Sequence, residues 1–280
     1  MHIIRILIEP EAEKRCNIIL TGNNITLGRN VTIDPSAKLL ADELVIGDFS
    51  KIGKNVIIAG SRVEIGREAW ITTDVLIGGG RSEMGSLKTG DFLHLGQRAM
   101  VNIANDVDIG DDVGIGMEGK VFSHGAYLSE YDGFPYQDGP VTIGSNVWMP
   151  YAIVNPNVTI GDNVVVAAMS LINKDLPSGC LAGGIPVKIL RENVYPRVIS
   201  EEEKIRIVDQ VIKEVKHFNI KSDRNDSGTF ITLGKTSFDL PNRRIEGPAN
   251  KETDKIKDIL RRHGIRFRYY NDGEQYRPWD

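Results

Sequence analysis

At 280 residues the chain is long enough for one large domain and a smaller one. Its 34 basic and 38 acidic residues give a formal net charge of -4, which predicts no general attraction to nucleic acid or to an anionic membrane. Cys16 and Cys180 lie far apart with no CxxC pair, so neither a disulfide framework nor a zinc site is expected. No window approaches ~18 unbroken apolar residues. The apolar start is interrupted by Arg5, which argues against a signal peptide, and we expect a cytoplasmic location.

From residue 25 the sequence repeats with a period near six. The segments ITLGRN, VTIDPS, VIGDFS and KIGKNV each place an aliphatic residue at the same point, and the pattern returns in VDIGDD, VTIGSN and VTIGDN. Amphipathic helices repeat at 3.6 residues and half-buried strands at 2, so this period fits neither as a continuous element. It fits a short strand plus a tight corner, three of which make one triangular coil. A β-sandwich is the alternative, but its strands alternate and its loops vary in length.

A small or turn-tolerant residue accompanies the buried aliphatic residue in most repeats. These residues are Gly28, Asp34, Gly53, Gly66, Gly110, Gly116, Gly144 and Gly161. Glycine accepts a positive φ and aspartate bonds locally to the backbone, so we expect them at the corners for those reasons.

Two stretches interrupt the period, residues 78–94 and residues 120–139. Insertions in repeat proteins usually project as functional loops on one face. The second stretch, KVFSHGAYLSEYDGFPYQDG, carries His124 among glycines and aromatic residues. It is therefore the first place to look for chemistry.

Residues 20–192 resemble the left-handed β-helix, or hexapeptide-repeat, acyltransferases. Residues 141–193 resemble the cofactor-binding end of sugar and xenobiotic acetyltransferases, such as maltose, galactoside and streptogramin acetyltransferases. The resemblance implies a mainly β fold, a left-handed parallel β-helix, with acetyl-CoA as the acyl donor and no metal. It also implies a homotrimer in which each site lies between neighbouring chains. The implied acceptor is a small molecule, a sugar or nucleotide sugar, that is acylated on a hydroxyl or amino group.

The same resemblance assigns individual residues. In that family a loop before the NVW segment carries the catalytic histidine, and His124 occupies this position; a neutral imidazole can take the proton of an attacking hydroxyl. Positions that match the cofactor site are Trp148, Tyr151, Ala168, Asn173, Lys174, Lys188 and Arg191. Asn102, Asn105 and Tyr127 are candidates for binding the acceptor, and His94 is interpreted as structural or substrate-facing.

Departures from the family pattern leave other functions open. Pro150, Met169 and Ile185 replace residues that are usually smaller or different, which is compatible with a non-catalytic trimeric scaffold or binding protein. Carbonic anhydrases share the fold but need three histidines around zinc, and the repeat region has only His94 and His124.

After Arg191 the period stops. Residues 200–218 predict an amphipathic helix with a capping box at Ser200 and Glu203, which we expect to pack on the last coil and shield an open sheet edge. Residues 220–280 predict a small α+β domain, so the expected segments are 1–192, 193–219 and 220–280. The last segment contains a basic and aromatic cluster, for which a solvated face is favoured over a nucleotide-binding site: Arg243, Arg244, Arg266, Arg268, Tyr269 and Tyr270.

Overall fold

The computed structural model describes residues 5–8, 19–80 and 84–279. They divide into two compact units, Met1–Pro196 and Arg197–Asp280. No helix among the described residues is long and apolar enough to cross a membrane.

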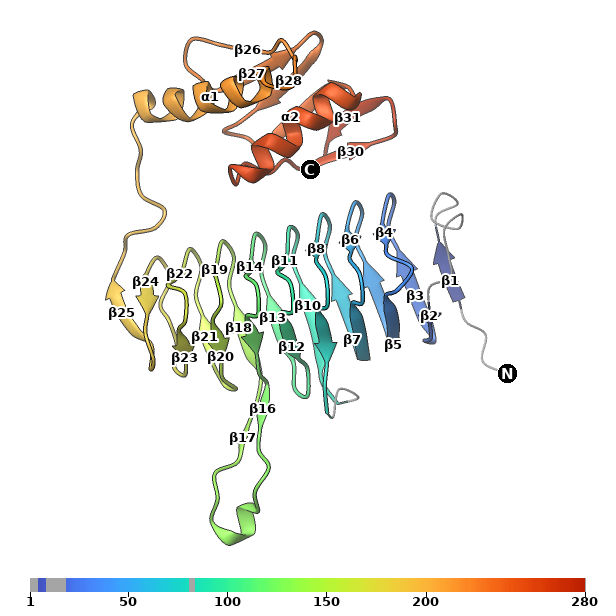
Figure 1. The fold of residues 1–280 in the computed structure, drawn as a ribbon, viewed down its shortest axis with the longest axis vertical. Helices are drawn as coiled ribbons and strands as arrows, with labels where there is room; N and C mark the ends of the chain where they lie inside the picture. Colours follow the sequence, from blue (N-terminus) through green and yellow to red (C-terminus); the bar gives the residue numbers. More distant parts are fainter. Residues whose placement is uncertain (1–4, 9–18, 81–83, 280) are drawn as a thin grey trace. The chain divides into compact units, whose positions relative to one another are not determined.

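The first unit is a parallel β-helix (Figure 1). Each coil contributes strands to three faces of the β-helix, which are named B, A and C in the order in which the chain runs through them. Face B contains β2 (Ile19–Leu20), the first parts of β5 (Lys38–Ile46) and β7 (Ile57–Ile65), β9 (Leu76–Gly78), β12 (Met100–Asn102), β15 (Lys120–Val121), β20 (Ile153–Val154) and β23 (Leu171–Ile172). Face A contains β1 (Arg5–Ile8), β3 (Asn24–Leu27), the last parts of β5 and β7, β10 (Ser86–Thr89), β13 (Val107–Ile109), β18 (Val141–Ile143) and β21 (Thr159–Ile160).

Face C contains β4 (Thr32–Ile33), β6 (Lys51–Ile52), β8 (Trp70–Ile71), β11 (His94–Leu95), β14 (Gly114–Ile115), β19 (Trp148–Met149), β22 (Val165–Val166), β24 (Leu181–Gly183) and β25 (Lys188–Arg191). All of these strands pair in parallel except β25, which turns back antiparallel on β24 and is the last strand of this face. The predicted fold class, a left-handed parallel β-helix followed by a helix and a small α+β part, is confirmed.

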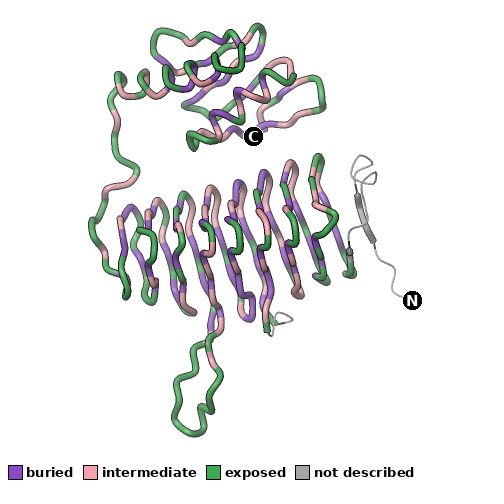
Figure 2. Tube along the Cα trace, viewed as in Figure 1, coloured by how far each residue is buried: buried purple, intermediate pink, exposed green. Residues whose placement is uncertain are grey.

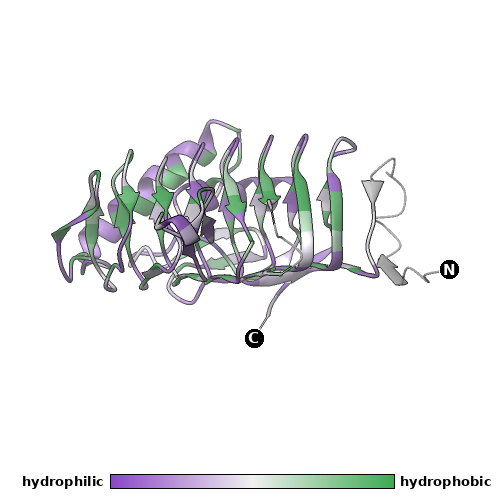
Figure 3. Cartoon of the chain, turned by 90° about the horizontal axis from the view of Figure 1, so that it is seen from below, coloured by the Kyte–Doolittle hydropathy of each residue, from purple (hydrophilic) through white to green (hydrophobic). Residues whose placement is uncertain are grey.

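The core is a column of aliphatic side chains inside each face, because one strand residue in two points inward (Figure 2). On face C the column runs through Ile52, Ile71, Leu95, Ile115, Met149, Val166 and Ala182, all at most 3% exposed. Figure 3 shows the resulting alternation, with apolar strand positions and more polar corners. The six-residue period therefore predicts the core directly.

The corner glycines have a different cause from the expected one. All of the glycines named at the sequence level have an ordinary φ, whereas positive φ angles fall on larger corner residues such as Phe49 (61°) and Phe92 (63°). What these glycines share is the close approach of the next coil: a Cβ on Gly66 would lie 2.3 Å from the carbonyl oxygen of Gly90. Stacking distance, not backbone conformation, explains the glycine at this position.

We expect Gly66→Ala to destabilise the β-helix by about 1–3 kcal/mol, because the new methyl group meets backbone atoms that cannot rotate away. Urea unfolding at fixed protein concentration measures this. Gly80→Ala is the matched control, since a Cβ there has no neighbour within 4 Å in the part of the chain that the structure describes. Equal losses in the two variants would contradict the close-stacking explanation.

Both interruptions of the period leave the β-helix at the edge between faces B and A. The first interruption was expected at residues 78–94 and is shorter, because β10 and β11 already belong to faces A and C. It lies between β9 and β10, and its residues 81–83 fall outside the described part. The second is a long hairpin built from β16 (His124–Gly125) and β17 (Gln137–Asp138), with the 3-10 helix η2 (Glu130–Asp132) near its tip (Figure 1).

The second unit is a six-stranded antiparallel sheet with two helices. The strand order is β26 (Asp223–Arg224), β27 (Phe230–Leu233), β28 (Thr236–Asp239), β29 (Arg244–Pro248), β31 (Gln275–Pro278), β30 (Tyr269–Asn271). The helix α1 (Glu201–Lys216) belongs to the second unit, where it packs on α2 (Lys251–Arg262) and β26. Its expected packing on the last coil stays a prediction. Its apolar stripe, Val208, Val211, Ile212 and Val215, is buried as predicted.

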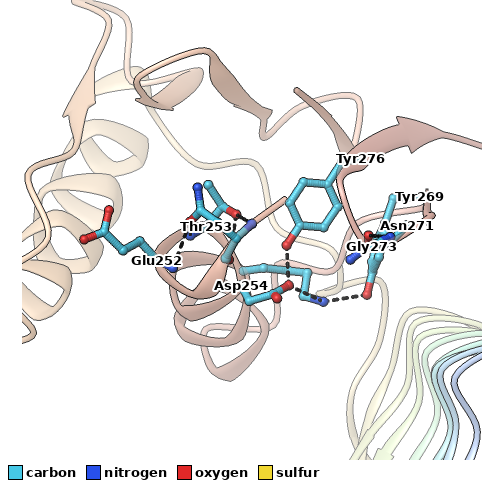
Figure 4. A network of polar contacts seen from close by, with 9 residues as sticks. Glu252, Thr253, Asp254, Tyr269, Asn271, Gly273 and Tyr276 are labelled. Carbon is cyan, nitrogen blue, oxygen red and sulfur yellow. Dashed lines mark hydrogen bonds and ion pairs between the residues drawn. The ribbon is translucent and has the colours of Figure 1, made fainter. Parts of the chain in front are cut away.

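A buried polar network ties α2 to β30 and β31 (Figure 4). The Tyr276 hydroxyl donates to Asp254, and the Lys257 ammonium donates to the Tyr269 hydroxyl at 2.6 Å and lies 3.4 Å from Asp254. Tyr269, which we had placed in a solvated cluster, is 1% exposed. The cluster is therefore not a single exposed surface, because this residue belongs to the core.

Burial, together with the hydrogen bond to Asp254, raises the pKa of Tyr276 above its ordinary value of 10. Above pH 10 the unfolded chain loses this proton while the folded chain keeps it, so stability falls with pH by up to about 1.4 kcal/mol per pH unit. We expect Tyr276→Phe to remove this part of the alkaline loss. The measurement is the free energy of unfolding in urea at several alkaline pH values. Unfolding is monitored by the fluorescence of Trp279 in a chain that also carries Trp70→Phe and Trp148→Phe. The exposed Tyr131→Phe is the control, and an unchanged slope in Tyr276→Phe would contradict the assignment.

Candidate functional site

His124 lies where the hairpin leaves the β-helix. It directly follows β15 and Ser123, and it pairs across the hairpin with Asp138. Its ring is partly buried and meets the ring of Tyr136 edge-on, with centroids 6.1 Å apart and planes at 76°. None of the described residues hydrogen-bonds its ring nitrogens. The imidazole is therefore held by its neighbours while both nitrogens stay available for a ligand or a proton.

Asn102 and Asn105, the candidates for acceptor binding, lie at the root of this hairpin. The Asn102 side-chain oxygen accepts from the Ala104 amide (3.3 Å) and the Ser123 hydroxyl (3.1 Å), and the residue is 6% exposed. The Asn105 side-chain amide donates to the Ser123 carbonyl at 2.8 Å and to the Asp138 carboxylate. These contacts assign both asparagines a part in holding the hairpin.

Tyr127 lies further out along the hairpin, where it is 98% exposed. Leu128, Tyr131 and Phe134 are exposed as well. The outer part of the loop is thus an aromatic and apolar surface separate from the hydrogen-bonded root.

Tyr151 and Ala168 lie on the other edge of face B, between faces C and B. Tyr151 has φ of 51° and a hydroxyl hydrogen-bonded to Glu118, which also receives the Arg98 guanidinium at 2.9 Å. The hydrogen bond from Arg98, and after it the one from the Tyr151 hydroxyl, lower the pKa of Glu118. The hydrogen bond to Glu118, and after it the charge of Glu118, raise the pKa of Tyr151. Ala168 is exposed in the next coil, beside Met169. This edge combines a fixed tyrosine with an open turn.

Face C carries the other predicted cofactor residues. Trp148 points outward and its ring covers Gly114, since a Cβ on that glycine would lie 2.5 Å from the indole. Lys188 and Arg191 are exposed on β25 of the same sheet. His94 contacts Trp70 edge-on at 5.5 Å, in line with the structural part of its interpretation.

Asn173 and Lys174 are exposed just after β23, on the edge between faces B and A. They share this edge with His124. The chain therefore brings together His124, Asn102, Asn105, Asn173 and Lys174 on one edge. It places Tyr151 and Ala168 on the other, about 15 Å away across a strand of face B.

The surface of face B between these edges is mostly apolar. Its outward column has two lysines among aliphatic side chains: Lys38, Ile57, Leu76, Met100, Lys120, Ile153 and Leu171. The corresponding column on face A is largely polar: Thr26, Val45, Glu64, Lys88, Asp108, Thr142 and Thr159. The described residues contain no group of three or more His, Cys, Asp and Glu side chains that could hold a metal ion.

The sequence analysis did not identify four residues at the root of the hairpin: Ser123, Tyr136, Asp138 and Asn157. Their roles depend on the pairing of the two hairpin strands and on the stacking of neighbouring coils, as when the Asn157 side chain donates to the Asp138 carbonyl at 2.8 Å. No spacing in the sequence signals such contacts.

Comparison with known proteins finds the same repeat. Residues 140–174 match the family model for the bacterial transferase hexapeptide (six repeats). The chain is 32% identical over 137 residues to a galactoside O-acetyltransferase of Escherichia coli (strain K12), covering 46% of this chain and 63% of that protein. It is 41% identical over 71 residues to a putative acetyltransferase of Staphylococcus aureus (strain COL), covering 24% and 36%.

Among solved structures, a hexapeptide-repeat acetyltransferase of Vibrio cholerae in complex with acetyl coenzyme A is 24% identical. It covers 52% of this chain and 69% of that one with a TM-score of 0.35. The chain spans less than two thirds of the two curated relatives named above. The resemblance inferred from the repeat is confirmed: residues 140–174 match the hexapeptide repeat, and the chain is similar to acetyltransferases.

Proposed function

We propose that the chain is a CoA-dependent acetyltransferase that acts on a hydroxyl or amino group of a sugar or sugar-like acceptor, with His124 as the general base. The observation that carries the proposal is the position of His124. It lies at the fixed root of a projecting hairpin, with neither ring nitrogen hydrogen-bonded by a described residue. The sequence similarity to a galactoside O-acetyltransferase supports the reaction class.

The chemistry assigned to His124 is a proton transfer in each direction. The neutral imidazole takes the proton of the acceptor group as its oxygen or nitrogen attacks the thioester carbonyl of acetyl-CoA. The tetrahedral intermediate then collapses, the carbon–sulfur bond breaks, and the imidazolium returns the proton to the leaving thiolate. The products are the acetylated acceptor and free CoA.

The cofactor residues in this proposal come from the predicted set. Tyr151 and Ala168 would line the pantetheine arm, because an exposed small residue beside a fixed ring leaves room for a narrow chain. Lys188 and Arg191 would meet the CoA phosphates, and Trp148 would lie beside them. Asn173 and Lys174 would contact the cofactor from the His124 edge. Tyr127 remains the candidate for contact with the acceptor.

A homotrimer with shared sites is part of the proposal. His124 and the pair Tyr151 and Ala168 lie on opposite edges of face B, so one chain does not bring them together. The apolar column between the edges is a surface that a second copy could cover, and a cyclic trimer would then place the His124 edge of one chain against the other edge of its neighbour.

The test is release of free CoA from acetyl-CoA with panels of simple sugars, amino sugars and nucleotide sugars. Acceptor-dependent release supports the enzyme and identifies the acceptor class. Binding of a panel member without any release, at all concentrations, would instead favour the non-catalytic scaffold. The cytoplasmic location stays a prediction that fractionation of the native cells can check.

A further inference from the structure

The root of the His124 hairpin is clamped from two neighbouring coils. From the preceding coil, the Asn105 amide nitrogen donates to the Ser123 hydroxyl at 2.9 Å, and its side chain donates to both hairpin strands, at Ser123 and Asp138. From the following coil, the Asn157 side chain donates to the Asp138 carbonyl. The backbone beside His124 is thus fixed to the rigid β-helix on both sides.

The Asp138 side chain extends this clamp toward the imidazole. One carboxylate oxygen accepts from Asn105, and the other accepts from the Tyr136 hydroxyl at 3.2 Å. The Tyr136 ring in turn meets the His124 ring edge-on. A continuous series of contacts therefore runs from the β-helix corner through Asp138 and Tyr136 to the face of the candidate base.

Without such contacts the ring of His124 could rotate about both side-chain torsions, because no described residue hydrogen-bonds it. An edge-on aromatic contact is worth about 0.5–1.5 kcal/mol, enough to bias one rotamer. Tyr136 is itself 43% exposed, so burial alone does not hold its ring in place. Its hydrogen bond to Asp138 restrains the ring.

We propose that Asp138 and Tyr136 are positioning residues for His124: Asp138, fixed by Asn105, tethers the Tyr136 hydroxyl, and the tethered Tyr136 ring sets the orientation of the imidazole. This rests on the proposed function of His124 as the base. Neither residue takes part in proton transfer. Each acts on the reaction only through the orientation of the ring.

The test is a double-mutant cycle of Tyr136→Phe, Asp138→Ala and the double variant. Both single changes break the same tether, so each should lower kcat about tenfold with an unchanged KM for acetyl-CoA, since a misplaced catalytic group costs rate rather than cofactor binding. The double variant should be no slower than the slower single variant. A further drop to about a hundredfold would mean that the two residues act independently, and would overturn the proposal.

Tyr131→Phe is the matched control, because Tyr131 belongs to the same hairpin but is 99% exposed; its kcat should equal that of the unaltered chain. Tyr136→Phe keeps the Asp138 clamp intact, so it remains informative even if Asp138→Ala fails to fold. Circular dichroism and melting temperature establish folding for each variant.

A readout independent of activity separates this proposal from the proposed function. With ¹³C-labelled histidine, the His124 Cε1–H signal, assigned by its loss in His124→Ala, should be displaced by the Tyr136 ring current. It should move toward the value of the exposed His217 in both single variants. An unmoved signal would overturn the positioning role while leaving the transferase intact. If the signal moves in both variants but the unaltered chain has no transferase activity, the contacts that orient the His124 ring are supported and the proposed function is rejected.

Discussion

His124→Ala is expected to lower the turnover number about 10²–10⁴-fold, because that is the usual contribution of a positioned general base. The melting temperature should change little, since the imidazole is only partly buried and accepts no hydrogen bond from the described residues. The measurement is acceptor-dependent release of CoA from acetyl-CoA, with the acceptor found in the panel above. The KM for acetyl-CoA should stay near that of the unaltered chain.

His217→Ala is the matched control, because this histidine caps α1 in the second unit and, among the described residues, its ring bonds only the Lys213 carbonyl. It should retain full activity. Retention of activity within threefold by a folded His124→Ala chain would place the base elsewhere.

Mixed trimers of two inactive variants should recover activity if sites are shared between chains. We expect His124→Ala to remove the base and Ala168→Trp to block the opposite edge of face B, where an exposed alanine leaves space. Each homotrimer should lose activity by about a hundredfold or more. In random mixtures about one site in four receives His124 from one chain and Ala168 from its neighbour, so up to about a quarter of full activity returns.

Coexpression with two different affinity tags isolates the mixed assemblies, in which about one site in three is complete, so the expected recovery rises to about a third. Each variant mixed with itself is the control. Sedimentation at several protein concentrations establishes the trimer. Mixed trimers without activity above the controls would place a complete site within one chain, and a fully active monomer would reject the shared site altogether.

The sequence predicted the β-helix well because its signal is local and repeated. Each coil needs an aliphatic residue inside every strand and a small residue where the next coil approaches, so the same six-residue requirement recurs along the chain and can be counted. The hairpin was equally visible, because residues 120–139 break the period. The boundaries of α1 and its apolar stripe followed from local capping and helical spacing.

What the sequence did not determine are relations between residues that meet only through folding. It predicted the glycines for the wrong reason, since their spacing from the next coil is a tertiary distance. It did not predict that α1 packs on α2 and β26 of the second unit. It assigned Tyr151, Ala168 and His124 to a site between neighbouring chains, but it did not show that the coil carries them to opposite edges of face B.

The contrast has one physical reason. A strand or corner is specified by its own residues and repeats faithfully, so the amino-acid sequence by itself determined the β-helix, its core and the position of the His124 hairpin. The contacts of Asn105 with Ser123 and Asp138, and of Tyr136 with His124, join residues from stacked coils and facing strands. Only the tertiary structure decided them, because each depends on how neighbouring coils align rather than on any residue's neighbours in the chain.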